Sequence, residues 1–403
     1  MQDSSNPRTA AIAGAGIGGL TAALCLARSG WKVEIFESAS RLSETGAGLQ
    51  LSPNAMRVLD SLGLKEKLTA NAFLPEAIEV RQWRSGRILS AEKLGDVTCQ
   101  RWGAPYYHVH RADLQNVLVN AVSERGIPLH LGHSIEDVQS GTRGTEFVLG
   151  NGQARNAALL IGADGIHSRI RERLWGRQNA RFTGHVAWRL LIPSALLPAD
   201  SIRPVASLWM GPGAHFVHYY VRGGNWLNCV CVVEQPDWRE ESWTVPGDKA
   251  ELKKAFEGWH PQIGMLLAAA DPGQCFRWAL FDREPMPHWS KGSVTLLGDA
   301  CHPTLPFLAQ GAAMAIEDAA VLASCLQSTD DISSALQRYE LRRRSRTARV
   351  QRTSRRNARI YHMRGPMAWV RNLALKTGLA STRKITDWLY SYNALESDEA
   401  ATH

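Results

Sequence analysis

The first forty residues alternate between apolar strands and an amphipathic helix. Residues 8–15 are small and apolar and end in glycines, which predicts a short buried strand. Residues 18–29 carry apolar side chains at helical spacing and stop at Gly30, and residues 31–37 alternate as a second strand does. Strand, glycine turn, helix and strand form a βαβ unit of about 30 residues, which is the usual form of a mononucleotide-binding half.

The pattern changes in the middle of the chain and returns near its end. Between residues 181 and 285 the runs are short and rich in β-branched and aromatic residues, which predicts a β-rich insertion. A buried strand follows at 294–303, and then a long helix at 311–327. We therefore expect an α/β fold with a Rossmann-type domain from residues 1–180 and 286–345, an inserted β-rich domain from 181–285, and C-terminal helices from 346–403.

Composition narrows the class of protein. Hydrophobic residues make up 44% of the 403 residues and charged residues 21%, so disordered, collagen-like and coiled-coil chains are excluded. No apolar run reaches the roughly 18 to 20 residues that span a bilayer, and the N-terminus lacks the features of a signal peptide. Seven cysteines at irregular spacing do not indicate a disulfide framework. We expect a cytoplasmic protein without stable membrane association.

The net charge of +8 comes largely from an arginine-rich stretch at residues 342–359. A nucleic-acid surface is not expected, because this stretch has no interleaved aromatic side chains and the upstream motifs point to a dinucleotide. The interpretation we favour is a solvated or inter-subunit helix, compatible with a homodimer. Steering of anions toward a site is the alternative.

A glycine-rich turn follows the first predicted strand. The sequence GAGIGG, which runs from Gly14 through Ala15 and Gly16 to Gly19, fits the pattern G-x-G-x-x-G. In that pattern the first glycine permits the tight turn, the second lets the backbone approach a pyrophosphate, and the third lets helix and strand pack closely. Glu37 ends the second strand, 23 residues after Gly14, where a carboxylate can accept hydrogen bonds from a ribose diol. Its charge disfavours NADP at this site and leaves FAD or NAD.

Two further blocks place an aspartate just past a buried strand. Asp164 lies in GADGIHSR and Asp299 in GDACHP, and ligands of α/β sheets bind at such strand ends. After the second block, small residues including Gly311 and Ala312 open a helix. The N–H groups at such a helix start can interact with a phosphate or an electron-rich ring.

With these three blocks the chain resembles the single-component FAD-dependent aromatic hydroxylases, the class A flavoprotein monooxygenases. It is most similar to the branch that holds salicylate hydroxylase and 6-hydroxynicotinate 3-monooxygenase, and the resemblance covers residues 8–345. The resemblance implies FAD as cofactor, NADH or NADPH as transient reductant, O₂, and a small aromatic substrate. In the implied reaction, reduced flavin traps O₂ as a C4a-hydroperoxide, whose distal oxygen is attacked by the electron-rich ring.

The resemblance also implies roles for single residues at the adenosine end of FAD. Glu37 would bind the adenosine ribose, and the three glycines of the first turn would hold the pyrophosphate. Arg111, in HVHRADLQ, resembles an arginine that reaches the ribose and the pyrophosphate. Ile135 matches a position whose backbone contacts adenine.

At the flavin end the implied residues come from the two aspartate blocks. Asp299 would hold the ribityl or pyrophosphate part, and Gly311 with Ala312 would offer backbone N–H groups to the flavin ring. Asp164 is similar to an aspartate that acts both in FAD placement and on the passing NADH or NADPH.

A histidine on a strand of the insertion is the candidate catalytic residue. A base raises the reactivity of a phenol by removing its proton, and histidine titrates near neutral pH. By pattern, His215 matches a substrate-facing histidine of the related hydroxylases. Strand alternation puts His215 and His218 on opposite faces, so one cavity cannot take both without a bulge. The alternative for either is an imidazole packed in the sheet, and we interpret His302 as structural.

Some residues depart from the family pattern or leave alternatives open. Gln50 stands where the 6-hydroxynicotinate enzymes carry a histidine, and Pro306 where some 3-hydroxybenzoate hydroxylases carry a glutamine, so neither substrate is assigned. Trp188 and Arg189 could bind an aromatic carboxylate or close the sheet. No metal-ligand spacing occurs, so no metal site is expected. A reductase that never activates O₂, and a partner-binding protein with structural FAD, are the alternative functions.

Overall fold

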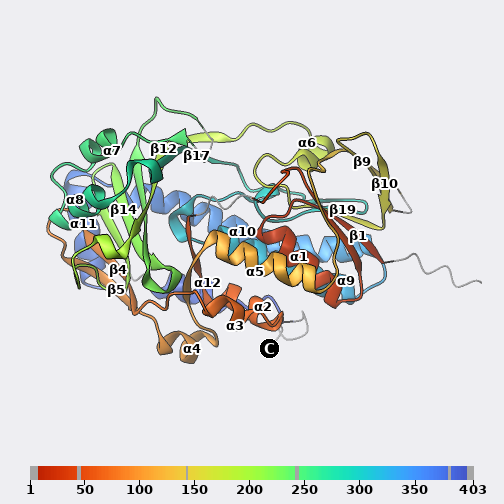
Figure 1. Ribbon diagram of the computed structural model, residues 1–403, viewed down its shortest axis with the longest axis horizontal. Coiled ribbons are helices and arrows are strands. Elements are labelled where there is room, and N and C mark those ends of the chain that lie inside the picture. Colours follow the sequence, from red (N-terminus) through yellow and green to blue (C-terminus); the bar gives the residue numbers. More distant parts are fainter. Residues whose placement is uncertain (1–7, 43–46, 142–143, 241–244, 380–382, 397–403) are drawn as a thin grey trace, which may run out of the picture.

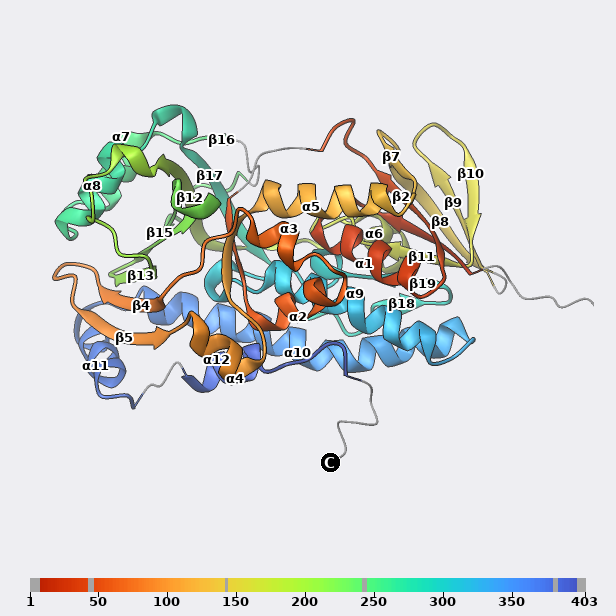
Figure 2. The ribbon, with the colours of Figure 1, turned by 60° about the horizontal axis from the view of Figure 1, so that its bottom comes forward.

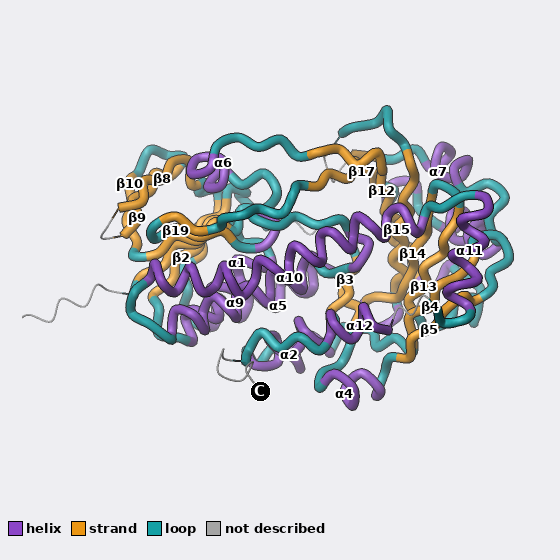
Figure 3. Tube along the Cα trace, turned by 180° about the vertical axis from the view of Figure 1, so that it is seen from behind, coloured by secondary structure: helices purple, strands orange, loops and turns teal. Residues whose placement is uncertain are grey.

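The computed structural model has two large sheets, one at either end of a long helix (Figures 1 and 3). A sheet flanked by helices contains the N-terminal strand, and a second, larger sheet lies at the other end of the molecule. Of the described residues, no helix combines the length and apolar character needed to cross a membrane. The structure describes residues 8–42, 47–141, 144–240, 245–379 and 383–396.

The first sheet has six strands and draws on both ends of the chain. Its order is β18-β19-β11-β1-β2-β7, parallel except for β18. The predicted βαβ unit is present as β1, α1 and β2, with the pairing Ala10 to Val33 in register. The strands are β1 (Thr9–Ala13), β2 (Lys32–Glu37), β7 (Leu129–Leu131), β11 (Leu159–Gly162), β18 (Ser290–Lys291) and β19 (Val294–Leu296).

Helices cover this sheet, and the buried face of α1 is almost wholly apolar. Helix α1 packs between α5 and α9, and α9 in turn packs on α10. A three-stranded antiparallel sheet, β10-β9-β8, lies beside helix α6. The elements are α1 (Ile17–Arg28), α5 (Arg111–Glu124), α6 (Arg169–Trp175), α9 (Gly311–Gln327), α10 (Ile332–Tyr361), β8 (Ile135–Gly141), β9 (Gly144–Leu149) and β10 (Ala154–Ala157).

The second sheet has eight strands in the order β16-β17-β12-β15-β14-β13-β4-β5. Two of them come from outside the predicted insertion, because β4 pairs in parallel with β13 and brings β5 with it. The strands are β4 (Ala77–Gln82), β5 (Ile88–Lys93), β12 (Arg181–Pro193), β13 (Ala206–Gly211), β14 (Ala214–Val221), β15 (Trp226–Glu234), β16 (Val245–Pro246) and β17 (Phe276–Asp282).

The two faces of this sheet are covered differently. Trp209, Phe216 and Cys229 pack on one face in a core closed by helices α7 (Lys249–Ala255) and α8 (Pro261–Ala269). Residues of the opposite face, such as Ala187, pack toward α10. Strand alternation therefore sets which side chains of β14 can reach the space beside α10.

The remaining elements connect the two sheets. Helix α10 runs lengthwise beneath both, and α11 lies against β5 (Figure 2). The bounds are β3 (Gly48–Leu51), β6 (Tyr107–His110), α2 (Pro53–Ser61), α3 (Lys65–Thr69), α4 (Asp96–Trp102), α11 (Gly365–Lys376), α12 (Arg383–Tyr390), and the 3-10 turns η1 (Ser194–Leu196), η2 (Arg222–Gly224), η3 (Pro272–Gln274), η4 (Gly298–Ala300) and η5 (Pro306–Leu308).

The arginine-rich stretch is only in part the solvated face that we expected: Arg349, Arg352, Arg356 and Arg359 are exposed, whereas two of its arginines are buried. It lies in α10, where Arg343 is fully buried and bonds to Asp318 of α9 at 2.6 Å. Arg346 is also buried and bonds to Glu317 at 2.7 Å. Because acidic side chains on α9 neutralise them, these arginines can lie inside the protein. The expectation is wrong for them, and α10 continues without a break through the predicted domain boundary after residue 345.

Candidate functional site

The glycines of the β1–α1 turn have three different surroundings. Gly14 has a φ of +103°, and a Cβ there would lie 2.5 Å from the carbonyl oxygen of Ala163. A Cβ on Gly19 would clash with the carbonyl oxygen of Gly14. Gly16 has ordinary extended dihedral angles, and no described atom lies within 4 Å of its Cβ position. The fold requires Gly14 and Gly19. Gly16 is not needed for packing, and because it has no side chain, a ligand can approach the protein backbone there.

Glu37 lies beside this turn and fixes its shape. One carboxylate oxygen accepts a hydrogen bond from the N–H of Ala15 at 2.8 Å, and the other accepts one from the N–H of Ala39 at 2.9 Å. A carboxylate has about four acceptor positions, so capacity remains for a ribose diol. The N–H of His133 donates to the carbonyl of Glu37 at 2.8 Å, which brings Ile135, two residues further on, into the same neighbourhood.

Asp164 offers an unused acceptor at the end of β11. One of its oxygens accepts from the N–H of Arg169 at 2.8 Å, at the start of α6. The other oxygen is buried and has no hydrogen-bond partner among the described residues. Burial raises the pKa of this carboxyl, although the hydrogen bonds from α6 oppose the shift. Buried polar atoms are nearly always paired, so this oxygen fits a donor from a bound ligand.

Asp299 and Arg111 lie close enough to interact electrostatically. Asp299 follows β19, and its side chain is solvent-exposed. The surrounding protein nevertheless raises the pKa of Asp299, while His302 and Arg111 lower it in part. Arg111 is exposed at the first turn of α5, where its N–H bonds to the carbonyl of Ala47 at 3.0 Å. An exposed guanidinium in this place suits a pyrophosphate.

The N-terminus of α9 is open to a ligand. The side chain of Gln310, at the N-cap position, does not cap the helix because it bonds instead to Ser52 at 3.0 Å and to Asn54 at 3.1 Å. The first N–H groups, those of Gly311 and Ala312, therefore carry no side-chain cap. They can donate to the electron-rich edge of a flavin ring.

These features fit FAD. A Cβ on Gly14 would meet Ala163, and one on Gly18 would meet Leu297, so the glycine turn packs directly on the strands that carry Asp164 and Asp299. The glycine surface, the unpaired carboxylate oxygen and the uncapped helix N-terminus lie on one side of the first sheet, along the carboxyl ends of its parallel strands. That edge is where α/β sheets bind dinucleotides.

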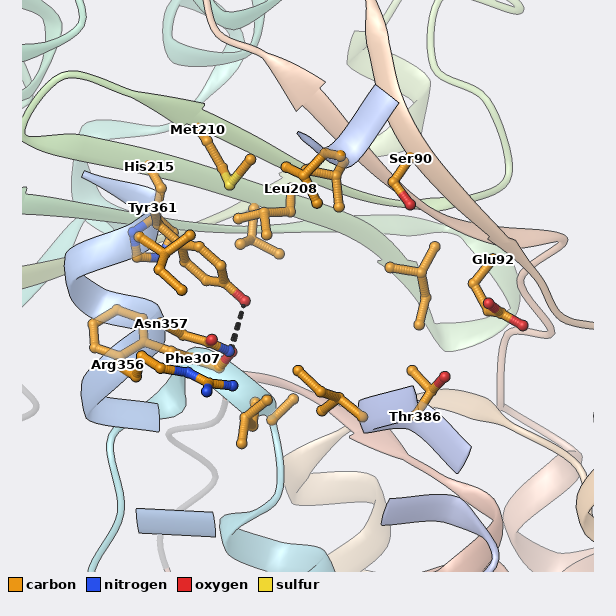
Figure 4. Close-up of a pocket in the computed structure, with 18 of the residues that line it drawn as sticks. Ser90, Glu92, Leu208, Met210, His215, Phe307, Arg356, Asn357, Tyr361 and Thr386 are labelled. Atoms are coloured by element: carbon orange, nitrogen blue, oxygen red, sulfur yellow. Dashed lines mark hydrogen bonds between the residues drawn. The ribbon is translucent and has the colours of Figure 1, made fainter. Parts of the chain in front are cut away.

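A cavity of about 590 Å³ lies beside the start of α9. Pro306 to Ala309, in and after η5, form part of its wall, two residues before Gly311. Its other walls come from β3, from β4, β5, β13 and β14 of the second sheet, and from α10, α11 and α12 (Figure 4). The lining is mainly apolar, and its polar and charged members are Gln50, Ser90, Glu92, Ser207, His215, Arg356, Asn357, Tyr361, Arg371, Thr386 and Tyr390.

His215 is the predicted catalytic histidine, and it faces this cavity (Figure 4). Its Nδ1 lies 2.7 Å from Nε2 of His362, which leaves Nε2 of His215 for a ligand. Burial holds the pKa of His215 well below its usual range, with His362 adding to the effect. His218 points to the opposite face, as alternation predicted, and accepts a hydrogen bond from the indole of Trp209 at 3.1 Å.

Other residues that the sequence singled out have structural roles. His302 lies 2.6 Å from Asp318 and belongs to the buried ion network of α9 and α10. Trp188 packs in the core under α7 and α8, away from the cavity. Arg189 lies on the opposite face of the same strand, over the ring of Phe276. Neither lines the cavity, so the structure places them as parts of the sheet.

Sequence reasoning missed the contribution of the C-terminal segment. Tyr361, Arg371 and Ile385 line the cavity, although the helical pattern of the tail gave no indication of a site. The hydroxyl of Tyr361 accepts from Asn357 at 3.2 Å and donates to the carbonyl of Phe307 at 3.1 Å (Figure 4). The only signal was the alternation of apolar residues with single arginines, which is also common on surface helices.

Within the part of the chain that the structure describes, one group of side chains has ligand atoms close enough for a metal ion. His185, Glu234 and His362 bring one ligand atom each to within 4.8 Å of the others. They come from three separate elements, so no spacing in the sequence could reveal them. Arg364 donates to the same carboxylate at 2.5 Å, and its positive charge disfavours a cation there.

Comparison with known proteins identifies the family. The model of the FAD binding domain family matches residues 8–354, and the chain belongs to this family. A 3-amino-4-hydroxybenzoate 2-monooxygenase of Streptomyces platensis is 37% identical over 97% of this chain and 98% of its own. A 3-hydroxybenzoate 6-hydroxylase of Polaromonas naphthalenivorans is 38% identical over 98% of both chains. A 6-hydroxynicotinate 3-monooxygenase of Bordetella bronchiseptica is 36% identical over 96% of this chain and 95% of its own.

Solved structures agree with these relatives. Klebsiella pneumoniae HpxO, complexed with FAD and uric acid, has a TM-score of 0.84 and 28% identity, covering 95% of both chains. A salicylate hydroxylase substrate complex has a TM-score of 0.83 and 26% identity, covering 97% of both chains. The predicted fold, the FAD cofactor and the class of enzyme, an FAD-dependent aromatic monooxygenase, are confirmed. The roles of the single site residues stay predictions.

Proposed function

We propose that this protein hydroxylates a small phenolic aromatic acid bound in the cavity against His215. The reaction would use FAD, NADH or NADPH, and O₂. One observation carries the proposal: a mainly apolar cavity of about 590 Å³ holds a buried histidine and adjoins the uncapped start of α9. A flavin ring at that helix start would border the cavity, and the cavity has room for one benzene ring with its substituents.

FAD would be held by groups from both ends of the chain. Glu37 would accept from the adenosine ribose, and the turn at Gly16 with Arg111 would bind the pyrophosphate. Asp164 and Asp299 would accept from hydroxyl groups, and Gly311 with Ala312 would donate to the ring. When bound, FAD supplies the route by which NADH or NADPH reduces O₂ and one oxygen atom enters the aromatic ring.

The cavity lining favours an aromatic carboxylate as substrate. Leu208, Met210 and Val217 offer an apolar surface for the ring. Arg356 and Arg371 add positive charge, and burial lowers the pKa of Arg371 to about 10, which still leaves it charged at neutral pH. The three relatives named above act on rings that carry both a hydroxyl and a carboxylate.

The substrate of this chain differs from those of two named relatives in our proposal. Gln50 and Pro306, the two positions that depart from the family pattern, both line the cavity. The hydroxyl of Tyr106 donates to Gln50 at 2.6 Å and fixes the amide there. The departures therefore fall where they would contact a ring substituent, which supports a phenolic acid other than 6-hydroxynicotinate or 3-hydroxybenzoate.

His215 would act as the base. Its low pKa keeps the imidazole neutral at physiological pH, so Nε2 can accept the proton of the substrate hydroxyl. The phenolate that remains pushes electron density into the ring carbons that are attacked. The apolar surroundings of His215, with Phe307 and Tyr361 at ring distances of 5.2 and 5.4 Å, keep the imidazole in place.

Several features of the organisation remain proposals. We keep the division into residues 1–180 with 286–345, 181–285, and 346–403 as a description of the domains. The eight-stranded sheet takes β4 and β5 from the first segment, so strands of both domains line the cavity. A cytoplasmic location and a homodimer also stay predictions.

The experiment that tests the function is anaerobic reduction of the bound FAD by NADH or NADPH. A panel of hydroxybenzoates and hydroxypyridines is added, and bleaching of the flavin is followed by stopped-flow absorbance. We expect one compound to accelerate reduction by at least about 100-fold, since substrate-dependent positioning can contribute that much. Reduction at one rate with every compound and with none would contradict the proposal and favour a reductase.

A further inference from the structure

A row of three side chains leads from the cavity to the surface. Nδ1 of His215 lies 2.7 Å from Nε2 of His362, and Nδ1 of His362 lies 3.4 Å from a carboxylate oxygen of Glu234. His215 and His362 are buried, whereas the Glu234 side chain is 39% exposed. The three residues come from β14, from the end of α10 and from β15, so only the fold brings them together.

The middle residue has an unused ring nitrogen. Nδ1 of His362 is buried and makes no hydrogen bond to any described residue, and the oxygen of Glu234 is too far for a good one. The backbone around it is fixed, because the N–H of Gly213 donates to the carbonyl of His362 at 3.1 Å. A small rotation of the imidazole or the carboxylate would bring Nδ1 of His362 into hydrogen-bond distance of Glu234. This hydrogen bond would give the buried Nδ1 atom a partner.

The charged groups around the row favour neutral imidazoles. His185 of β12 lies at a ring distance of 5.0 Å from His362, and Arg364 and Arg371 approach from the C-terminal side. Burial, with these neighbours, lowers the pKa of His362 to about 3. Arg364 donates to the second oxygen of Glu234 at 2.5 Å and so holds the carboxylate at the mouth of the row.

We propose that His362 and Glu234 form a proton path that connects His215 to solvent, an inference that rests on the proposed function. The O–H bond of the bound phenol breaks, and its proton goes to Nε2 of His215. The proton on Nδ1 of His215 passes to Nε2 of His362, and the proton on Nδ1 of His362 passes to Glu234 and then to water. Reprotonation of the product in the reverse order restores the original tautomers.

The proton path prevents a positive charge from building up on the buried His215. A proton left on His215 would produce an imidazolium in a desolvated cavity beside two other histidines and two arginines, which is costly. Passing the proton outward leaves every imidazole neutral and the new negative charge on the phenolate. The same arrangement disfavours a metal ion, because the cation would compete with Arg364 for the carboxylate of Glu234.

The test follows deprotonation of a coloured probe, 4-hydroxy-3-nitrobenzoate, whose phenolate absorbs visible light. The FAD-loaded enzyme is mixed with the probe in weak buffer below the pKa of the phenol, and the phenolate band and the release of protons to an indicator dye are recorded together. His362→Gln should slow the phenolate band by about tenfold or more, since general base catalysis is worth at least that much. Added imidazole should restore the rate. Glu234→Gln should show a smaller slowing with the same rescue.

Two controls separate the path from mere structure. Glu257→Gln removes an exposed carboxylate outside the row and should leave the rate unchanged. If His362→Gln retains FAD and binds the probe with unchanged affinity, its binding site is intact. Glu234→Gln tests the proton path independently, at the residue that is exposed to solvent. The wild-type rate with the wild-type buffer dependence in both variants would overturn the path. In that case, substrate-accelerated FAD reduction in the wild-type enzyme would still support the proposed function.

Discussion

The glycines of the first turn are the smallest residues of the site, and they differ in what a single methyl group would touch. At Gly14 the methyl would meet the backbone of Ala163, and the φ of +103° would be strained for any other residue. At Gly16 the methyl would meet only the space where the pyrophosphate is expected. Two alanine substitutions therefore separate the needs of the fold from those of the cofactor.

Gly14→Ala should lower the free energy of unfolding of the FAD-free protein by at least about 2 kcal/mol, from backbone strain and overlap. Gly16→Ala should leave that stability unchanged but weaken FAD binding by about tenfold or more, which is about 1.4 kcal/mol of lost contact. Urea unfolding and a fluorescence titration with FAD measure the two quantities. Gly264→Ala, on α8 and with no described atom near its Cβ position, is the control. Equal effects of the first two variants on both measurements would refute the assignment.

His215 is the second residue on which the account depends. His215→Asn should retain FAD and substrate-stimulated oxidation of NADH but lose about 100-fold in product formation, because the base contributes roughly 10² to 10⁴. Product by chromatography and NADH by absorbance give the ratio of the two rates. His218→Asn, on the opposite face of β14, is the matched variant and should keep that ratio. Loss of both rates to the same extent in His215→Asn would remove this histidine from the mechanism.

At the scale of the elements, α9 and α10 are joined by a buried ion network. Burial alone would raise the pKa of Asp318, but His302 and Arg343 outweigh it and lower that pKa to about 2. Arg343→Met should cost about 3 to 5 kcal/mol of unfolding free energy, because it leaves buried carboxylates without a partner. Arg344→Met, four residues from Glu340 and partly exposed, should cost less than about 1 kcal/mol. Chemical unfolding of both variants measures the two free energies of unfolding. Similar decreases in both variants would show that the ion network does not stabilise the pair of helices.

Buried histidines of the second sheet and its neighbours predict sensitivity to acid. Burial lowers the pKa of His108, His218 and His362 to about 3 and that of His215 well below its usual range. The unfolded chain takes up these protons below about pH 6.5 and the folded chain does not, so stability is present above that pH and lost below it. The loss should be about 1.4 kcal/mol for each histidine and pH unit. Urea midpoints that stay constant between pH 7.5 and 5.5 would contradict these environments.

Local patterns explain why so much of the fold could be predicted. The β1–α1–β2 unit and the faces of β14 both follow from periodicity and turn residues within short windows. Strand β4 could not be placed, because its partner β13 is more than 120 residues away and polar positions interrupt both. The burial of Arg343 was missed because charged residues are normally exposed, and its acidic partners lie on another helix.

The candidate site divides in the same way. Most of the predicted FAD-binding residues lie in three contiguous blocks whose spacing carries chemical meaning, so the sequence could indicate them; Glu37, Arg111 and Ile135 lie outside these blocks. The cavity, in contrast, is assembled from nine elements, and its histidine pair joins residues 147 positions apart. No periodicity or spacing encodes such a pair, which forms only when α10 ends beside β14.

Across the whole molecule, the cavity lies between strands of the second sheet and helices α10, α11 and α12. Helix α10 packs on α9, which covers the first sheet, and extends to the second sheet (Figure 2). Tyr361 and His362 lie at this end of α10. Helices α11 and α12 then close the remaining side of the cavity. In our proposal, FAD bound along the first sheet and substrate bound beside the second sheet would meet at the start of α9, as a reaction between a flavin and an aromatic ring requires.

The central claim is that one oxygen atom of O₂ enters an aromatic ring at this meeting point. The most direct measurement incubates the FAD-loaded enzyme with NADH, isotope-labelled O₂ and the compound that most accelerates flavin reduction. Mass spectrometry of the product should show one labelled oxygen per molecule and close to one NADH consumed for each product formed. Consumption of NADH with hydrogen peroxide as the only oxygen product, or a hydroxyl group whose oxygen comes from water, would contradict the account.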